Sequence, residues 1–156
     1  MKERKSARAL IINEKNEVLL EKFEFPKVKG NKVLWVTPGG GLKGDETYEI
    51  ALERELYEEL GLEVTINSNP VLVKDVLIEG KIEMFNSHEV YYLLNLNSNQ
   101  VFNLKNMTKN EIDTLQGIKW WTLQELKEIS NFAPPEIKEI LRKNSKLVKS
   151  KNVWLS

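Results

Sequence analysis

The stretch from Asp45 to Gly61 carries the strongest helical pattern in the chain, and it is the feature that most constrains the fold. Leucines recur at every fourth position there, so on a helix they form one apolar stripe. These leucines are Leu52, Leu56 and Leu60. Asp45 or Thr47 can cap the start of the helix, and a glycine such as Gly61 is typical of a helix end. The chain must therefore bury one face of this helix.

Strand-like runs lie on both sides of the helix. We predict strands over residues 7–12, 17–23, 33–36, 71–78, 81–85, 90–96 and 118–121, with turns at Asn13–Asn16 and Glu79–Gly80. Further helices are predicted over residues 122–129 and 136–142, and the polar segment 97–117 holds at most a short helix near residues 108–115. Because the strands come in hairpin-like groups, we predict a mixed α/β domain of the α+β type with a largely antiparallel or mixed sheet.

The composition is that of an ordinary globular protein, with 41% hydrophobic and 29% charged residues among 156. We expect one domain over residues 1–156, with a core of about 6–142 and a basic C-terminal tail of about 143–156. The apolar run Ala9–Ile12 is too short for a signal peptide, and no segment is long enough to span a membrane. We therefore expect a cytoplasmic protein. The absence of cysteine excludes disulfides, thiolate metal sites and cysteine nucleophiles.

The net charge argues against a nucleic-acid partner. Lys plus Arg and Asp plus Glu both number 23, so no overall field attracts a polyanion or an anionic membrane. The basic ends, residues 1–5 and 143–151, are more typical of solvated tails. We expect a small-molecule partner, and a homodimer stays an open alternative.

The predicted helix has an acidic face in an unfavourable place. Glu55, Glu58 and Glu59 fall within about 100° of arc and border the leucine stripe. Like charges four residues apart cost about 0.2–0.5 kcal/mol, and the helix C-terminus disfavours anions by about 0.3–1 kcal/mol. Arg54 can reach Glu58, but one guanidinium cannot neutralise three carboxylates. A divalent cation with oxygen ligands can, which predicts a Mg²⁺ or Mn²⁺ site.

A glycine run precedes this helix. Pro38 is followed by Gly39, Gly40 and Gly41, with Gly44 beyond, and we expect a loop whose backbone can approach a phosphate closely. By itself such a run is equally typical of a surface turn. The spacing between the glycines and the acidic face favours the phosphate interpretation.

The two features together follow one spacing. It consists of Gly40, Glu46, Arg54, Glu55, Leu56, Glu58, Glu59, Gly61 and Leu62. This spacing matches the Nudix box, G-x5-E-x7-R-E-U-x-E-E-x-G-U with U a bulky aliphatic residue, at every defined position. The chain also has a Trp35 that leads into the glycine run and a later strand ending in Trp120–Trp121. It resembles the Nudix hydrolase family over most of residues 6–142.

This resemblance implies an α/β/α sandwich with a mixed sheet between helices. It also implies hydrolysis of a nucleoside diphosphate linked to another group X, by attack of water on phosphorus with Mg²⁺ or Mn²⁺. By resemblance, Glu55 and Glu59 are metal ligands, and Glu58 is a ligand or helps to activate water. Arg54 orients the glutamates, and Glu46 braces the loop against the helix. The substrate contacts are assigned to Gly39, Gly40 and Gly41. Two alternatives are a nucleotide-binding module that does not cleave and a pyrophosphohydrolase of RNA 5′ ends.

Residues outside the box offer weaker candidates. Members of the family usually recruit a further base or ligand downstream, and Glu111 is the first choice here, with Glu89 and Glu83 behind it. Thr108 and Glu111 fit a capping box equally well. For four more groups of residues, a functional role competes with an ordinary structural one. The functional roles are phosphate contacts for Arg8 and Lys22, titration near neutral pH for His88, and base stacking for Trp35, Phe25, Tyr91 and Tyr92. Of Trp120 and Trp121, we expect one in the core and the other over a helix or beside the cleft.

Overall fold

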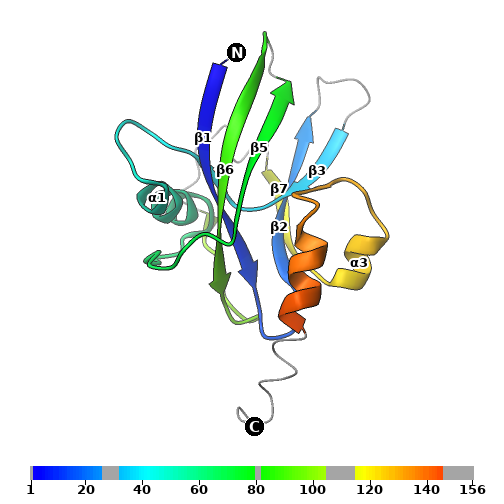
Figure 1. Ribbon diagram of the computed structural model, residues 1–156. Helices are drawn as coiled ribbons and strands as arrows, with labels where there is room; N and C mark the ends of the chain where they lie inside the picture. The colour runs from blue at the N-terminus through cyan, green and yellow to red at the C-terminus, as the bar shows by residue number, and fades with distance from the viewer. Residues whose placement is uncertain (1, 26–31, 80–81, 105–114, 146–156) are drawn as a thin grey trace. The chain divides into compact units, whose positions relative to one another are not determined.

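Figure 1 shows the computed structural model of the chain. The structure describes residues 2–25, 32–79, 82–104 and 115–145. The chain forms two compact units. The first contains the described residues of Met1–Leu10, Pro38–Leu94 and Val101–Ile112, and the second those of Ile11–Thr37, Asn95–Gln100 and Asp113–Ser156. Within the described ranges, no helix has the length and apolar character that a membrane crossing requires. The expectation of a single domain stays a prediction.

The first unit is built on a mixed sheet. Its strands are β1 (Lys2–Ile12, whose last two residues belong to the second unit), β4 (Gly39–Gly41), β5 (Leu72–Glu79) and β6 (Met84–Asn95, whose last residue belongs to the second unit). β6 lies between β5 and β1, and β4 pairs with β1. β5 runs antiparallel to β6, whereas the arrows of β6 and β1 point the same way in Figure 1. The prediction of a mixed sheet in an α+β protein is confirmed.

Helix α1 (Tyr48–Leu60) confirms the predicted helix and its boundaries. Thr47 caps the start, since its hydroxyl accepts a hydrogen bond from the backbone N–H of Ile50 at 3.1 Å. Gly61 ends the helix in the left-handed region with φ of 68°, which glycine adopts without strain. The leucine stripe of Leu52, Leu56 and Leu60 is fully buried. The helix packs against β4, which brings its acidic face to the glycine run.

The structure corrects two expectations in this unit. The glycine run is a short strand and not a loop, because Gly39, Gly40 and Gly41 pair with Arg8, Ala7 and Ser6 of β1. The predicted strands 81–85 and 90–96 are largely one continuous strand, β6. Its polar middle does not interrupt it, because the side chains alternate: Ser87 and Glu89 are buried, whereas Asn86 and His88 face Asp75 of β5. Gly80 of the predicted turn lies outside the described residues.

The second unit joins four strands and two helical segments. The strands are β2 (Val18–Phe25), β3 (Lys32–Val36), β7 (Leu115–Trp121) and β8 (Phe132–Ala133), and β2 pairs antiparallel with both β3 and β7. The unpredicted β8 pairs parallel with β3. Helix α3 (Leu123–Lys127) and a helix over residues 137–145 confirm the two helices predicted there, with shifted ends.

Local signals in the second unit act as the sequence indicates. In the turn between β1 and β2, Asn13 Oδ1 accepts from the backbone N–H groups of Lys15 and Glu17, and Asn16 has φ of 59°. Thr122 and Glu125 form a capping box at the start of α3. The predicted turn and helix start are therefore confirmed. The short helix expected near residues 108–115 lies almost entirely outside the described residues.

Candidate functional site

Arg54 is the centre of a dense cluster in the first unit. Its guanidinium forms a two-pronged contact with Glu46, from Nε at 2.7 Å and from Nη2 at 2.9 Å. Nη2 also donates to the carbonyl oxygen of Gly41 at 3.0 Å. Glu46 in turn accepts from the backbone N–H of Lys43 at 2.7 Å. One side chain of α1 thus fixes both β4 and the loop that follows it.

The charge on Glu46 is strongly stabilised. The hydrogen bonds from Arg54 lower the pKa of the Glu46 carboxyl from 4.5 to about 2, and the backbone N–H of Lys43 adds to the effect. The same contact raises the pKa of Arg54 above its ordinary value. A bidentate, charge-assisted pair of this kind is geometrically specific as well as strong. Both groups are therefore charged at neutral pH.

Three carboxylates of α1 face this same side. Nη1 of Arg54 donates to Glu55 Oε1 at 3.1 Å and to Glu58 Oε2 at 3.3 Å, so these two carboxylates share one nitrogen. Glu59 is buried, with 4% of its surface exposed, and its Oε1 accepts from the backbone N–H of Gly39 at 3.0 Å. Glu55 and Glu58 therefore meet at Arg54, while Glu59 lies against Gly39.

The charge balance of the cluster favours a cation. Glu46, Glu55 and Glu58 all contact the guanidinium of Arg54, Glu59 lies against the N–H of Gly39, and the last turn of α1 carries no basic residue. Within the described residues, no three acidic or histidine side chains close around one point as a complete metal cage would. Mg²⁺ does not need such a cage, because it keeps several waters and binds one or two carboxylates together with substrate phosphates. This open set of hard oxygen donors fits that ion.

The glycine strand packs closely against its neighbours, most of all at Gly39. A Cβ on Gly40 would lie 2.6 Å from Glu55 Oε1, and a Cβ on Gly39 would lie 2.1 Å from the carbonyl oxygen of Ala7. Gly39 also has φ of 132°, which other residues rarely adopt. The absence of side chains here lets the carboxylate of Glu55 lie directly against the strand.

A buried row of polar side chains lies on β1 and β6, beside the glycine strand. Ser6 Oγ is 3.5 Å from Ser87 Oγ, and Ser87 donates to Glu89 Oε2 at 3.0 Å. Arg8 Nε lies 3.5 Å from Glu89 Oε1, and Arg8 Nη1 donates to the carbonyl oxygen of Gly39 at 3.1 Å. We call Ser6, Arg8, Ser87 and Glu89 the polar row. From the sequence, Arg8 and Glu89 are only separate weak candidates, because strand alternation alone does not show that they meet.

The remaining candidates are scattered. Glu111, Thr108 and the side chain of Phe25 lie outside what the structure describes, so the proposed base stays a prediction. Glu83 is exposed, and Lys22 pairs with Glu24 at 3.6 Å on β2.

The histidine and the aromatic candidates are held by other side chains. His88 Nδ1 lies 3.0 Å from Asp75 Oδ1. Tyr91 and Tyr92 are buried, and Trp35 packs edge-on against Trp121 with ring centroids 4.9 Å apart. Trp121 is thus the buried member of its pair.

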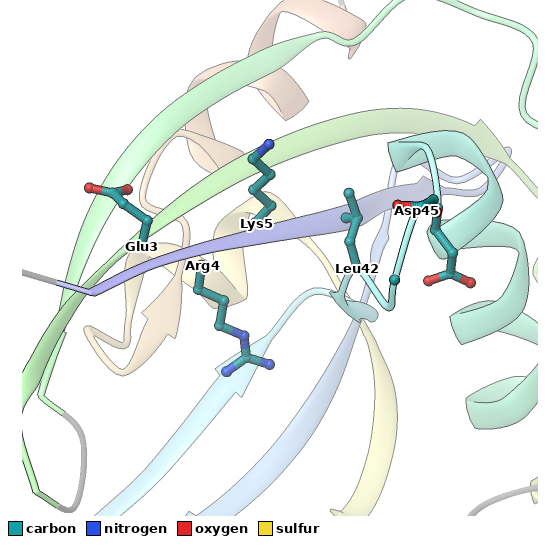
Figure 2. A pocket seen from close by; sticks show the side chains of 7 residues that line it. Glu3, Arg4, Lys5, Leu42 and Asp45 are labelled. Carbon is teal, nitrogen blue, oxygen red and sulfur yellow. The ribbon is translucent and has the colours of Figure 1, made fainter.

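A cleft of about 570 Å³ is lined by residues of β1 and of the loop between β4 and α1. Its lining residues are Glu3, Arg4, Lys5, Leu42, Gly44, Asp45 and Glu46. Figure 2 shows that Arg4 points away from one side of β1 while Glu3 and Lys5 point away from the other. The two basic residues therefore do not converge, and three carboxylates accompany them. This mixed lining marks no anion site.

The chain is similar to known proteins in both sequence and fold. The sequence matches the family model of the NUDIX domain over residues 2–143. The fold is similar to the crystal structures of a MutT protein from Methanosarcina mazei Go1 (TM-score 0.60, 21% identity, 93% of this chain and 96% of that one) and of a MutT NUDIX hydrolase from Burkholderia pseudomallei (0.62, 20%, 91% and 98%). It is also similar to a C. elegans Ap4A hydrolase (0.56, 21%, 94% and 98%).

The match of the family model covers more than half of the chain, and the full Nudix box lies within it. The structural neighbours have the same fold and nearly the same length. The predicted family and fold class are therefore confirmed. The chain belongs to the Nudix hydrolase family.

Proposed function

We propose that this protein is a metal-dependent pyrophosphohydrolase that cleaves a phosphoanhydride bond in a nucleoside diphosphate linked to another group X. Water attacks one phosphorus, and the phosphate on the other side of the bridging oxygen leaves. The observation that carries the proposal is the convergence of Glu55 and Glu58 on one nitrogen of Arg54, with Glu59 buried beside them. A cluster this acidic at a helix C-terminus is costly unless a cation joins it.

The proposed metal ligands are Glu55, Glu58 and Glu59, with Mg²⁺ or Mn²⁺ as the ion. When bound, the metal supplies charge neutralisation on the phosphates and a more acidic water. The chain itself has to keep the three carboxylates ionised and directed to one place. The contacts of Arg54 with Glu55 and Glu58 and of Gly39 with Glu59 support that role.

The loop between β4 and α1 has a proposed supporting role. Glu46 links the loop to Arg54 through two hydrogen bonds and to Lys43 through a third. Holding reactants in the correct geometry contributes much of the rate of such reactions. We propose that Glu46 and Arg54 together fix the distance between the loop and the glutamates. Gly39, Gly40 and Gly41 form the proposed substrate side of the site, where a phosphate can approach backbone without meeting a Cβ.

The substrate class is a small nucleotide derivative. The balanced charge of the chain gives no support to an RNA substrate. One structural neighbour is an Ap4A hydrolase by name, which makes dinucleoside polyphosphates one class to test. Nucleoside triphosphates and nucleoside diphosphate sugars are the other two, since all three contain the bond in question. We also propose that the protein acts in the cytoplasm, as the sequence predicts.

The test is a panel of these compounds assayed with Mg²⁺ and with Mn²⁺, with phosphate products quantified. We expect turnover of at least one compound, and none after the metal is chelated. The matched pair of variants is Glu59→Gln and Glu53→Gln. Glu53 is on the same helix, but its Oε2 accepts from the backbone N–H of Ile66 at 2.8 Å, away from the cluster. Only Glu59→Gln should lower the rate of turnover by about 100-fold or more.

Other outcomes would point elsewhere. Tight nucleotide binding without turnover would contradict the proposal and favour a non-catalytic binding module. Turnover restricted to triphosphorylated RNA would contradict the small-molecule substrate and favour the RNA 5′-end activity. Turnover that survives chelation, or that Glu59→Gln leaves unchanged, would contradict the metal mechanism.

A further inference from the structure

The guanidinium of Arg4 on β1 is held by packing against two neighbouring strands. Its central carbon lies 6.0 Å from the centroid of the Phe85 ring on β6, within the range of a cation–π contact. On β4, a Cβ added to Gly41 would lie 3.1 Å from Arg4 Nε and 3.2 Å from Arg4 Nη2. Because Gly41 has no side chain, the guanidinium lies directly against the backbone of β4. These two contacts restrict the orientation of its planar group.

The N–H donors of Arg4 are not used by the part of the protein that the structure describes. Among the described residues, Arg8 and Arg54 bind carboxylates, whereas Arg4 is exposed and forms neither an ion pair nor a hydrogen bond. A guanidinium carries five N–H donors in a fixed fork and has no acceptor of its own. Arg4 is therefore suited to a ligand that presents two acceptors side by side.

The cleft of about 570 Å³ that Arg4 lines does not favour a phosphate. Of its charged residues, Glu46 is already paired with Arg54. The remaining four charges balance, and they belong to Glu3, Arg4, Lys5 and Asp45. The side chains of Arg4 and Lys5 point to opposite sides of β1 (Figure 2), so they cannot clamp one phosphate between them. An uncharged ligand group with hydrogen-bond acceptors fits this lining better.

The cleft adjoins the acidic face of α1. Glu46 lines the cleft and accepts two hydrogen bonds from Arg54. Nη1 of the same guanidinium donates to Glu55 and Glu58. One guanidinium thus separates the cleft from the proposed metal ligands. A nucleotide whose phosphates lie at the acidic face can therefore place its uncharged end, the base, in the cleft.

We propose that this cleft binds the nucleobase of the substrate and that Arg4 selects a 6-oxopurine, which is guanine or hypoxanthine. Arginine pairs with guanine through the adjacent acceptors O6 and N7, whereas adenine presents N7 beside an amino group that donates. Hypoxanthine has the same two acceptors as guanine. Cytosine also has two adjacent acceptors, but one of them lies beside the bond to the sugar. The inference rests on the proposed function, because it assumes that the phosphates lie at the acidic face.

The experiment measures equilibrium binding by isothermal titration calorimetry in the presence of Mg²⁺. The probes are analogues of GTP, ITP, ATP and CTP in which CH₂ replaces the bridging oxygens, so that they are not cleaved. We expect the guanine and hypoxanthine analogues to bind at least about 10-fold more tightly than the adenine and cytosine analogues, as a bidentate arginine contact discriminates between bases. Arg4→Met should remove this preference by weakening the binding of the guanine and hypoxanthine analogues.

Two further variants separate the fork of Arg4 from its charge. Arg4→Lys keeps the positive charge but replaces the planar fork by a point charge, so it should not restore the preference. Lys2→Met is the matched control, because it removes a positive charge from the same strand outside the cleft. It should bind all four analogues like wild type. Thermal unfolding verifies that each variant is folded.

The alternative results are distinct. Equal binding of the four analogues, a preference for adenine or cytosine, or a preference that survives Arg4→Met overturns the inference. If Arg4→Met weakens all four analogues equally, Arg4 binds the phosphates and the inference is likewise overturned. Absence of binding to wild type has the same meaning.

Turnover of the natural nucleotides separates this inference from the proposed function. Selective binding through Arg4 without turnover of any nucleotide contradicts the proposed function alone. Turnover without selection between the bases contradicts only the role of Arg4.

Discussion

Two regions of the first unit use charge in opposite ways. The acidic face of α1, made of Glu55, Glu58 and Glu59, places two carboxylates on the guanidinium of Arg54 and the third against the N–H of Gly39. The polar row on β1 and β6 pairs one carboxylate with one guanidinium and caps it with serines. The first region has excess negative charge and the second is balanced. Excess negative charge favours the binding of an external cation, whereas paired charges such as those of the polar row fix the positions of their own side chains.

The regions also differ in how far their partners lie along the chain. The acidic face is formed by residues within one turn of a helix, so its convergence follows from helical geometry alone. In the polar row, Ser6 meets a serine 81 positions away. The two regions join at Gly39, which contacts Arg8 through its carbonyl and Glu59 through its N–H. Substitutions at Gly39, in either region and in the residues that hold the acidic face in place should lower stability or kcat by different amounts.

The largest effect is expected where the regions meet. Gly39→Ala places a Cβ 2.1 Å from the carbonyl oxygen of Ala7 at φ of 132°. We expect the free energy of unfolding to fall by at least about 3 kcal/mol, because strain adds to the clash. Urea unfolding measures it. A loss below about 1 kcal/mol would show that β4 can shift without cost, and the two regions would then be independent.

Breaking the acidic face should reduce catalysis and spare folding. Glu59→Gln keeps the size of the side chain but removes its charge. We expect kcat to fall by at least about 100-fold, the scale found when a charge-stabilising group is removed. Steady-state kinetics with Mg²⁺ provide the measurement. A fall smaller than about 10-fold would mean that Glu59, like the polar row, does not take part directly in the reaction.

Breaking the polar row should reduce stability. Arg8→Met leaves the buried Glu89 carboxylate without its cation, and losing one partner of a buried pair costs more than the pair itself contributes. The Arg8 side chain is 22% exposed, so we expect a loss of about 2 kcal/mol, below the range for fully buried pairs. Denaturant unfolding of Arg8→Met and of the double variant with Glu89→Gln checks this. The double variant should be the more stable of the two.

The support of the acidic face should respond to acid. The pKa of Glu46 is about 2 in the folded protein against an ordinary 4.5, so its contribution is complete above pH 4.5 and is lost as the pH falls toward 2. At neutral pH we expect Glu46→Gln to cost about 1.5 kcal/mol of unfolding free energy, as a lost charged hydrogen bond does. The free energies of unfolding of wild type and variant, measured across this pH window, should approach each other as the pH falls. A constant difference would contradict the assignment.

The smallest effect is expected at the start of the helix that carries the acidic face. Thr47→Ala removes the hydroxyl that accepts from the N–H of Ile50. The expected loss of unfolding free energy is about 1 kcal/mol, typical of a helix cap. Because the cap lies at the opposite end of α1 from Glu58 and Glu59, kcat should stay near that of wild type. A large fall in kcat would mean that the acidic face depends on the whole helix.

The sequence alone predicted most of the helices and strands and the family. Helix α1 and its end at Gly61 followed from local periodicity and capping chemistry, whereas the choice of Thr47 over Asp45 as its cap came from the structure. It missed the strand character of Gly39–Gly41, because glycine is typical of turns and only pairing with β1 makes it a strand. It divided β6 at residues 86–89, because polar residues look like a break until alternate burial is visible.

What the sequence determined by itself is the acidic face and the family, since both depend on spacings within a few helical turns. Tertiary structure alone decided that Arg8 and Glu89 meet, and that Gly39 lies between Arg8 and Glu59. The physical reason is that a strand fixes only which face a residue occupies. Which residue lies opposite depends on how strands distant in the chain are aligned, and that alignment is set by the packing of the whole unit.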